Sequence, residues 1–221
     1  MKNCIYLVIL LATLLGCASQ KSNDQFSGFL TERYYDKLSK IKSPSDEIIF
    51  RYISPDFEPT KYKHAIVEPI TAYPKPKPTE KVSKETLLTL QSKLTTLIEN
   101  SLPDSLSLVK DAGPDVLRIQ IVITAVNIAD KKLAAYEYIP TALVLAEASK
   151  AAGFRDQSVK LFLEGKVTDT ATNEVLAVGV REIKGEDLEN AKSKLQANEL
   201  NKGLTKAGKE FLSVFNKAVS K

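Results

Sequence analysis

The chain has 221 residues, 43% of them hydrophobic and 26% charged, which is the composition of one ordinary globular domain or two small ones. This composition excludes wholesale disorder, collagen-like repetition and a many-pass membrane protein. A net charge of +4 is too small to indicate a nucleic-acid partner, and one histidine with two cysteines gives too few ligands for a side-chain metal cluster. We therefore expect no metal and no other cofactor.

The N-terminus has the pattern of a secretory signal. A short segment with Lys2 precedes an apolar stretch over residues 5–15, which is too short to span a bilayer as a helix. It ends in Leu14-Leu15-Gly16-Cys17, which resembles the lipobox of bacterial lipoproteins. The resemblance implies cleavage between Gly16 and Cys17 and attachment of fatty acids such as palmitate at Cys17. The alternative is an ordinary signal peptide that ends near a cysteine by chance.

Lipidation of Cys17 would leave the mature chain without a free cysteine, since Cys4 leaves with the signal. Disulfides and thiol catalysis would then be excluded, and two or more acyl chains would anchor the protein stably to a membrane. Ala18-Ser19 stand where an Asp tends to retain Gram-negative lipoproteins in the inner membrane. For a Gram-negative source, the resemblance implies an outer-membrane lipoprotein that faces the periplasm.

The sequence after the signal predicts a tether followed by one domain. Residues 17–26, polar from position 18 to about position 25, predict a flexible tether, and residues 27–221 predict a single folded domain. A short helix is expected over residues 31–42, because its apolar residues recur at helical spacing. Two strands follow, over residues 48–53 and 65–70.

Three prolines within residues 73–78 predict an extended connector before a helix, and the alternative is a docking site for a partner that recognises proline-rich segments. A helix should begin after Ser83, a good N-cap residue, and end before Pro103. Its apolar residues recur every three or four positions and are expected to form core: Leu87, Leu90, Leu94, Leu97, Ile98 and Leu102.

The second half of the chain predicts the main strands. Apolar and polar residues alternate over residues 117–126 and 159–167. The first of these strands should be central, because its second face also turns apolar at Val122. Turn residues separate the second strand from another over residues 175–183, so these two form a hairpin.

Two helices complete the prediction, one over residues 141–153 and one from Glu186 onward that is interrupted near Gly203. Helices and strands mix without regular β-α-β alternation. The fold class is therefore α+β: a mixed, mostly antiparallel sheet of about four to six strands with amphipathic helices packed on it.

Several short motifs occur in the order and spacing of one known family. They are Ser27-Gly28-Phe29-Leu30, Arg51-Tyr52-Ile53-Ser54-Pro55, residues 62–70, Asp115-Val116-Leu117-Arg118-Ile119, residues 123–126 and the turn at residues 169–177. Together they resemble bacterial lipoproteins known only as domain of unknown function 3313. Asn173 departs from the glycine expected in the turn, but asparagine tolerates left-handed backbone. The resemblance implies an envelope lipoprotein of unknown activity and supplies no catalytic residue.

Few side chains indicate catalysis. His64 lies at the start of a predicted strand, where a surface or structural role is typical, and a general base would need an orienting carboxylate and a nucleophile. The candidate carboxylates show no ligand spacing and suit turns and caps: Asp111, Asp115, Asp169, Glu174, Glu186 and Asp187. We assign no catalytic residue and expect no enzyme. A periplasmic hydrolase that acts on a cell-envelope substrate through carboxylates remains the alternative.

Two segments are candidates for contact with a partner. The lysine-rich final helix could touch anionic lipid or cell-wall polymer, although interspersed acids favour a solvated face. The other segment is an apolar stretch that would contact an envelope protein, lipid or polymer unless it only covers the sheet: Tyr136, Tyr138, Ile139, Leu143 and Leu145. The sequence thus predicts a membrane-anchored module that binds or scaffolds something in the cell envelope.

Overall fold

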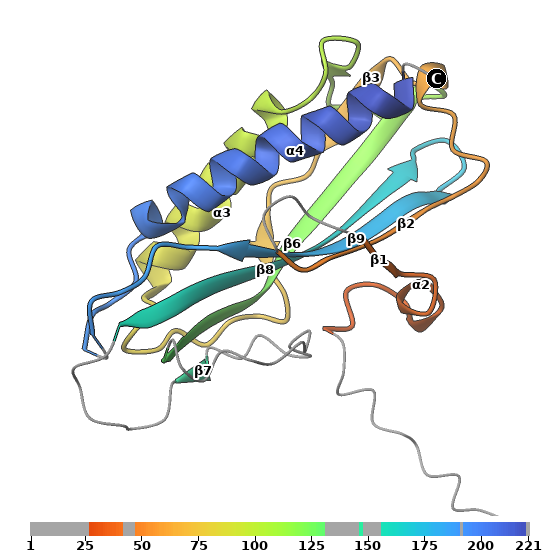
Figure 1. Ribbon diagram of the computed structural model, residues 1–221. Helices are drawn as coiled ribbons and strands as arrows, with labels where there is room; N and C mark the ends of the chain where they lie inside the picture. The colour runs from red at the N-terminus through yellow and green to blue at the C-terminus, as the bar shows by residue number, and fades with distance from the viewer. Residues whose placement is uncertain (1–26, 42–46, 131–145, 148–155, 191, 220–221) are drawn as a thin grey trace, which may run out of the picture.

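A computed structural model describes residues 27–41, 47–130, 146–147, 156–190 and 192–219. Within them lies one mixed sheet with the strand order β1-β2-β9-β8-β6-β3-β5, while β4 and β7 also pair with β6 (Figure 1). Three long neighbouring strands form its middle, each antiparallel to the next: β6 (Val116–Asp130), β8 (Gln157–Asp169) and β9 (Val175–Lys184).

Shorter strands extend the sheet on both sides. β2 (Ile49–Ile53) and β1 (Ser39–Ile41) continue it antiparallel beyond β9. Beyond β6, β3 (His64–Val67) and β5 (Ser107–Leu108) run parallel. Two further short strands pair with β6 in parallel: β4 (Thr71–Ala72) and β7 (Ala146–Glu147).

The α+β fold class, the central strand and the predicted hairpin are confirmed. The strand number is wrong: the described residues form nine strands in place of four to six. Four of the nine have only two or three residues. Such short strands show no alternation in the sequence, because only their backbone pairing to β2, β3 or β6 defines them.

Helix α3 (Lys84–Asn100) matches its prediction. The Ser83 hydroxyl accepts a hydrogen bond from the Thr86 backbone N–H at 3.0 Å, so Ser83 is the N-cap. Leu87, Leu90 and Leu94 are buried, and the predicted stripe faces the core.

The final helix differs from its prediction. The chain from Glu186 has no helix until a short 3-10 turn, η3 (Ala197–Leu200), after which α4 (Asn201–Val219) runs through Gly203 without a break. A Cβ at position 203 would lie 2.2 Å from the Lys184 carbonyl oxygen. Glycine is present here because α4 packs directly on the backbone of β9, and a helix interior tolerates it when packing requires it.

Two other helix predictions fail in part. The helix over residues 31–42 is only α2 (Glu32–Tyr35), because Ser39–Ile41 pairs with β2 as β1. Of the helix predicted over residues 141–153, Ala146–Glu147 is instead strand β7, and the rest lies outside the described residues. At Ser39–Ile41 and at Ala146–Glu147, pairing with a longer strand replaces the helix that the local pattern predicts. A 3-10 turn, η1 (Pro59–Lys61), precedes β3.

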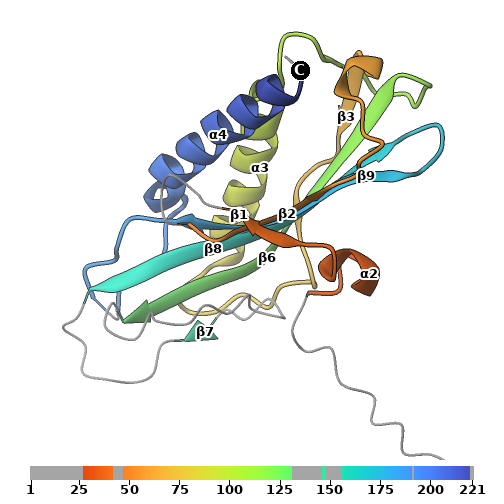
Figure 2. The same ribbon diagram turned by 45° about the vertical axis from the view of Figure 1, so that its right-hand side comes forward.

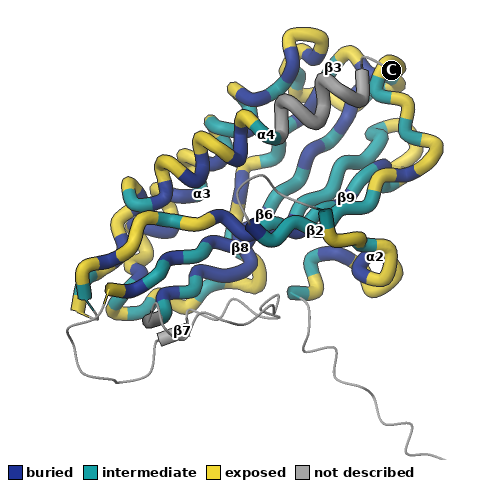
Figure 3. Tube along the Cα trace, in the orientation of Figure 1, coloured by how far each residue is buried: buried dark blue, intermediate teal, exposed yellow. Residues whose placement is uncertain are grey.

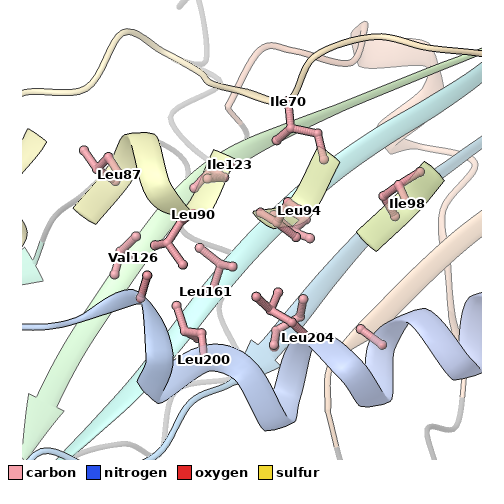
Figure 4. Close-up of a cluster of buried hydrophobic side chains, with 14 of the residues drawn as sticks. Ile70, Leu87, Leu90, Leu94, Ile98, Ile123, Val126, Leu161, Leu200 and Leu204 are labelled. Atoms are coloured by element: carbon pink, nitrogen blue, oxygen red, sulfur yellow. The ribbon is translucent and has the colours of Figure 1, made fainter. Parts of the chain in front are cut away.

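Helices α3 and α4 cover one face of the sheet, and α2 lies on the opposite face (Figures 1 and 2). Between the two long helices and the sheet is the main core, where Leu90 and Leu94 meet Ile123, Leu161 and Leu204 (Figure 4). In Figure 3 the tube is dark where α3 and the first turns of α4 meet the sheet, and yellow on the outer side of these turns. A bulge between Ile123 and Ala125 in β6 shifts the alternation, so that Val126 also reaches this core.

Candidate functional site on the outer face of the sheet

The face of the sheet opposite α3 and α4, here called the outer face, has a small core of its own. Residues 27–38 cross this face and are held on it by apolar contacts and hydrogen bonds. We call residues 27–38 the strap. The small apolar core of the outer face joins the strap to β2 and β9. Its buried members are Leu30, Tyr34, Tyr35, Val178 and Val180. Partly buried side chains pack against them: Phe29, Leu38, Phe50, Tyr52 and Val175.

The Tyr35 hydroxyl organises the strap. It accepts hydrogen bonds from the backbone N–H groups of Gly28 and Leu30, each at 3.2 Å. It donates to Oε2 of Glu164 at 2.6 Å. Gly28 has φ = +83°, a backbone conformation that glycine adopts without strain and that lets the chain bend around the hydroxyl. One side chain therefore fixes where the chain joins the domain.

Glu164 is a buried carboxyl in the middle of β8 with no exposed surface. Burial raises its pKa above the ordinary value, although hydrogen bonds from the strap, beginning with that of Tyr35, oppose this shift. Burial together with the bond to Glu164 raises the pKa of Tyr35 to about 12. The hydroxyl therefore stays protonated at neutral pH and serves as the donor to the carboxyl.

Cations lie over the aromatic rings around the strap. The Arg33 guanidinium is 4.6 Å from the Tyr34 ring centroid, and Lys37 Nζ is 4.9 Å from that of Tyr52. Lys166 Nζ is 5.1 Å from the Phe29 ring, which contacts Tyr73 edge-on with centroids 5.9 Å apart. These distances are those of cation–π pairs. We call this set the strap surface: Phe29, Arg33, Tyr34, Lys37, Tyr52, Tyr73 and Lys166.

Other buried charges form ion pairs that join elements. Lys160 Nζ is 3.1 Å from Oε2 of Glu182, which is almost fully buried on the outer face. On the helix-covered face, Arg181 of β9 contacts Glu47 at 2.9 Å and Glu210 of α4 at 2.7 Å. These side chains connect strands to each other and α4 to the sheet.

His64 begins β3 as the sequence predicts. Its Nε2 is 3.8 Å from Oδ2 of Asp115, and both side chains are a little over a third exposed. The His64 backbone N–H also donates to the Asp115 carbonyl oxygen at 3.2 Å. The pair thus joins the start of β3 to the turn before β6.

Asp169 has the turn role expected of it. Its Oδ1 accepts from the backbone N–H groups of Ala171 and Thr172 at 2.7 and 3.0 Å, and its Oδ2 accepts from Tyr62 at 2.9 Å. Burial would raise its pKa, but these hydrogen bonds outweigh burial and lower it. Asn173 has φ = +60°, which is the left-handed backbone that asparagine tolerates in a turn.

Two of the remaining predicted carboxylates, Glu174 and Glu186, lie at separate places in the fold. Glu186 pairs with Lys202 at 2.5 Å, and Glu174 follows the left-handed turn. Within the ranges that the structure describes, no three His, Cys, Asp or Glu side chains form a group that could hold a metal ion.

Two sets of predicted residues lie outside the described part of the chain. One is the processing site, Gly16 and Cys17. The other is the possible partner surface: Tyr136, Tyr138, Ile139, Leu143 and Leu145. Both remain predictions.

The sequence interpretation missed Tyr35 and Glu164. The alternation in β8 suggested a solvated polar face, with Lys160, Glu164 and Lys166 in one row. A signal was nonetheless present, because Phe162 interrupts that row with a large apolar side chain that is buried in the structure. An aromatic residue among charges indicates that another part of the chain covers the face.

The fold defines the protein as an α+β domain, and the sequence before it contains a segment that resembles a lipobox. The protein belongs to the family described as "Protein of unknown function (DUF3313)", which matches residues 25–211. It is 35% identical over 181 residues to the uncharacterized lipoprotein YdcL of Escherichia coli strain K12, covering 81% of each chain. The protein is thus a lipoprotein-family member whose activity is unknown.

Solved structures share only a loose likeness. Protein XCC0632 of Xanthomonas campestris aligns with a TM-score of 0.42 and 12% identity, over 76% of this chain and 93% of its own. The PelC dodecamer of Paraburkholderia phytofirmans aligns with a TM-score of 0.34 and 6% identity, over 78% and 96%. Similarity this weak carries no functional argument. None of the helices within the described residues is long and apolar enough to cross a membrane.

Proposed function

We propose that the protein is held at the outer membrane, facing the periplasm, by fatty acids such as palmitate on Cys17. The observation that carries this proposal is the segment Leu14-Leu15-Gly16-Cys17, in a chain that is 35% identical to a lipoprotein. Two or three acyl chains give stable anchoring. The folded domain follows after a short tether.

The domain acts as a binding or scaffolding module for envelope protein, lipid or polymer, without catalysis. Support comes from the buried carboxyl groups, because Glu182, Glu47 and Glu164 all join structural elements. Glu164 has the raised pKa of a general acid, but Tyr35 and the strap cover it. A substrate would have to displace the strap before reaching that carboxyl.

The anchor is tested by Cys17→Ser in the full-length chain, with Cys4→Ser as the matched control. The cells are labelled with an alkyne fatty acid and then fractionated. We expect Cys4→Ser to keep the label and the membrane association, and Cys17→Ser to lose both. A labelled Cys17→Ser protein would refute lipidation at this residue.

Placement in the outer rather than the inner membrane is tested by Ala18→Asp, which introduces the residue that retains lipoproteins in the inner membrane. On a sucrose gradient the wild-type protein should sediment with outer-membrane markers and the variant with inner-membrane markers. Wild-type protein in the inner-membrane fractions would refute outer-membrane placement without affecting the anchor.

Binding is separated from hydrolysis by two assays on the detergent-purified lipoprotein. Crosslinking in intact membranes should recover a specific partner. Incubation with peptidoglycan and with phospholipid vesicles should show no turnover. Turnover that disappears in Asp115→Asn or Glu164→Gln would establish the hydrolase instead.

A further inference from the structure

The strap determines which side of the domain is nearest to the lipid anchor. Nine residues separate Cys17 from Ser27, and the ten steps between their Cα atoms span at most about 36 Å even when fully extended. From Ser27 onward the chain is fixed, because Tyr35 holds Gly28 and Leu30 and is itself bonded to Glu164. The outer face at the strap is therefore the part of the domain that the anchor keeps close to the bilayer.

The side chains at that place suit a membrane interface. The strap surface combines aromatic rings with three cations, Arg33, Lys37 and Lys166, each seated over a ring. Aromatic side chains with a polar end favour the headgroup region, and basic side chains are attracted to anionic lipids. Tyr73 is 40% exposed at the edge of this set.

The excess of positive charge at the strap is modest, because Glu32 and Asp36 lie on the same short segment. A modest excess suffices for a tethered domain. The tether makes the second contact intramolecular, with an effective concentration in about the millimolar range for a short linker. An affinity too weak to recruit a free protein can then still orient an anchored one.

The exposed lysines of α4 form a second basic surface that could face the bilayer in place of the strap surface. Lys202, Lys206 and Lys209 are exposed on the helix, which lies on the opposite side of the sheet from α2 (Figures 1 and 2). Both surfaces cannot face one bilayer, so the position of the strap decides between them.

We propose that the strap surface lies against the bilayer that holds Cys17 and binds its anionic phospholipid headgroups, which leaves α4 facing away from the membrane. The proposal rests on the proposed lipid anchor. It gives the domain a fixed orientation, with α3 and α4 presented to the periplasmic side.

The orientation can be measured with single introduced thiols, because the lipidated mature chain has no free cysteine. The full lipoprotein carries Asp36→Cys beside the strap surface or Thr205→Cys on α4, labelled with a fluorophore. It is reconstituted into phosphatidylcholine vesicles with 0 or about 30% phosphatidylglycerol, a range that spans the anionic content at which basic residues bind. Lipids with a nitroxide on the headgroup quench the fluorophore by proximity.

In the anionic vesicles we expect several-fold stronger quenching at position 36 than at position 205. The difference should shrink without phosphatidylglycerol and with added salt. Arg33→Glu with Lys37→Glu should abolish the difference, while the matched reversal Lys206→Glu with Lys209→Glu should leave it unchanged. Equal quenching at both positions, or stronger quenching at position 205, would overturn the proposal.

Two controls keep the outcomes separate. Thermal unfolding shows whether the reversed strap still folds, and Arg33→Gln with Lys37→Gln replaces it if it does not. Mass spectrometry of the purified protein shows whether Cys17 is acylated. An unacylated protein refutes the anchor itself, whereas an acylated protein with no preferred orientation refutes only the strap surface.

Discussion

The two faces of the sheet are held by different kinds of interaction. On the face under α3 and α4, a broad apolar cluster that includes Leu90, Leu94 and Leu161 is buried. On the outer face the apolar cluster is small, and the side chains beneath and beside it include the buried carboxyls Glu164 and Glu182. Apolar burial is non-directional and grows with area, whereas a buried carboxyl requires a particular donor. The helix-covered face should therefore contribute most of the free energy of unfolding. The smaller contribution of the outer face should depend on single hydrogen bonds and on pH.

The largest effect is expected from Leu90→Ala on the helix-covered face. Leu90 has no exposed surface, and such a truncation costs about 2–5 kcal/mol through lost burial and a cavity. Leu88→Ala is the matched control, since Leu88 is 53% exposed on the same helix. Urea unfolding should show a large loss for the first variant and a change below about 0.5 kcal/mol for the second. Similar losses at both positions would contradict the packing of α3 described above.

Gly203→Ala should have the next largest effect. The new Cβ would lie 2.2 Å from the Lys184 carbonyl oxygen, so α4 must move away from β9 at a cost of about 1–3 kcal/mol. Gly179→Ala is the control, because its Cβ would meet only the Phe50 carbonyl oxygen at an ordinary 3.5 Å. Thermal unfolding of both variants measures the difference. A more stable Gly203→Ala protein, as helix propensity alone predicts, would refute the close approach.

Tyr35→Phe tests the outer face through one hydroxyl. Its removal leaves Glu164 without the Tyr35 donor and two strap N–H groups without their acceptor, a loss of about 1–3 kcal/mol. Tyr34→Phe is the control, since the Tyr34 hydroxyl contacts the exposed Arg33 side chain. In the Glu164→Gln background, Tyr35→Phe should cost less, because a neutral amide is a weaker acceptor for the Tyr35 hydroxyl than a carboxyl group and loses less when that donor is removed. Additive losses in this double-mutant cycle would exclude coupling between the two side chains.

The smallest effect is a pH dependence from Glu164. Because burial raises its pKa in the folded state, folding favours the protonated carboxyl. Its contribution to stability is full below the unfolded-state pKa of about 4.3 and is lost as pH rises through the raised folded-state pKa. Urea unfolding from pH 4 to pH 8 should show Glu164→Gln gaining stability relative to wild type as pH increases. Parallel curves for the two proteins would contradict a raised pKa.

Long regular patterns were predictable from the sequence, whereas features made by distant contacts were not. The stripe of α3 and the alternation of β6, β8 and β9 extend over ten or more residues, so their periods identify them. The segment after Tyr35 carries a helical pattern too short to resist pairing with β2.

The contact between Tyr35 and Glu164 illustrates the limit best. The two residues are 129 positions apart, and nothing local to β8 shows that a strap covers it. Within β8, only Phe162 indicates that the side chains on the face of Glu164 are covered and not solvated. Gly203 is a similar case: its local pattern reads as a helix break, and only the proximity of β9 explains it as a close contact.

Helix α4 follows all the described strands in chain order, yet it supplies part of the core that lies over them. Leu200, Leu204 and Ala207 complete the core over the sheet, and Glu210 forms the ion pair with Arg181. A growing chain that lacks these last residues has an uncovered apolar sheet face and cannot reach its final stability. The domain therefore reaches its full stability only when residues 200–210 have packed on the core.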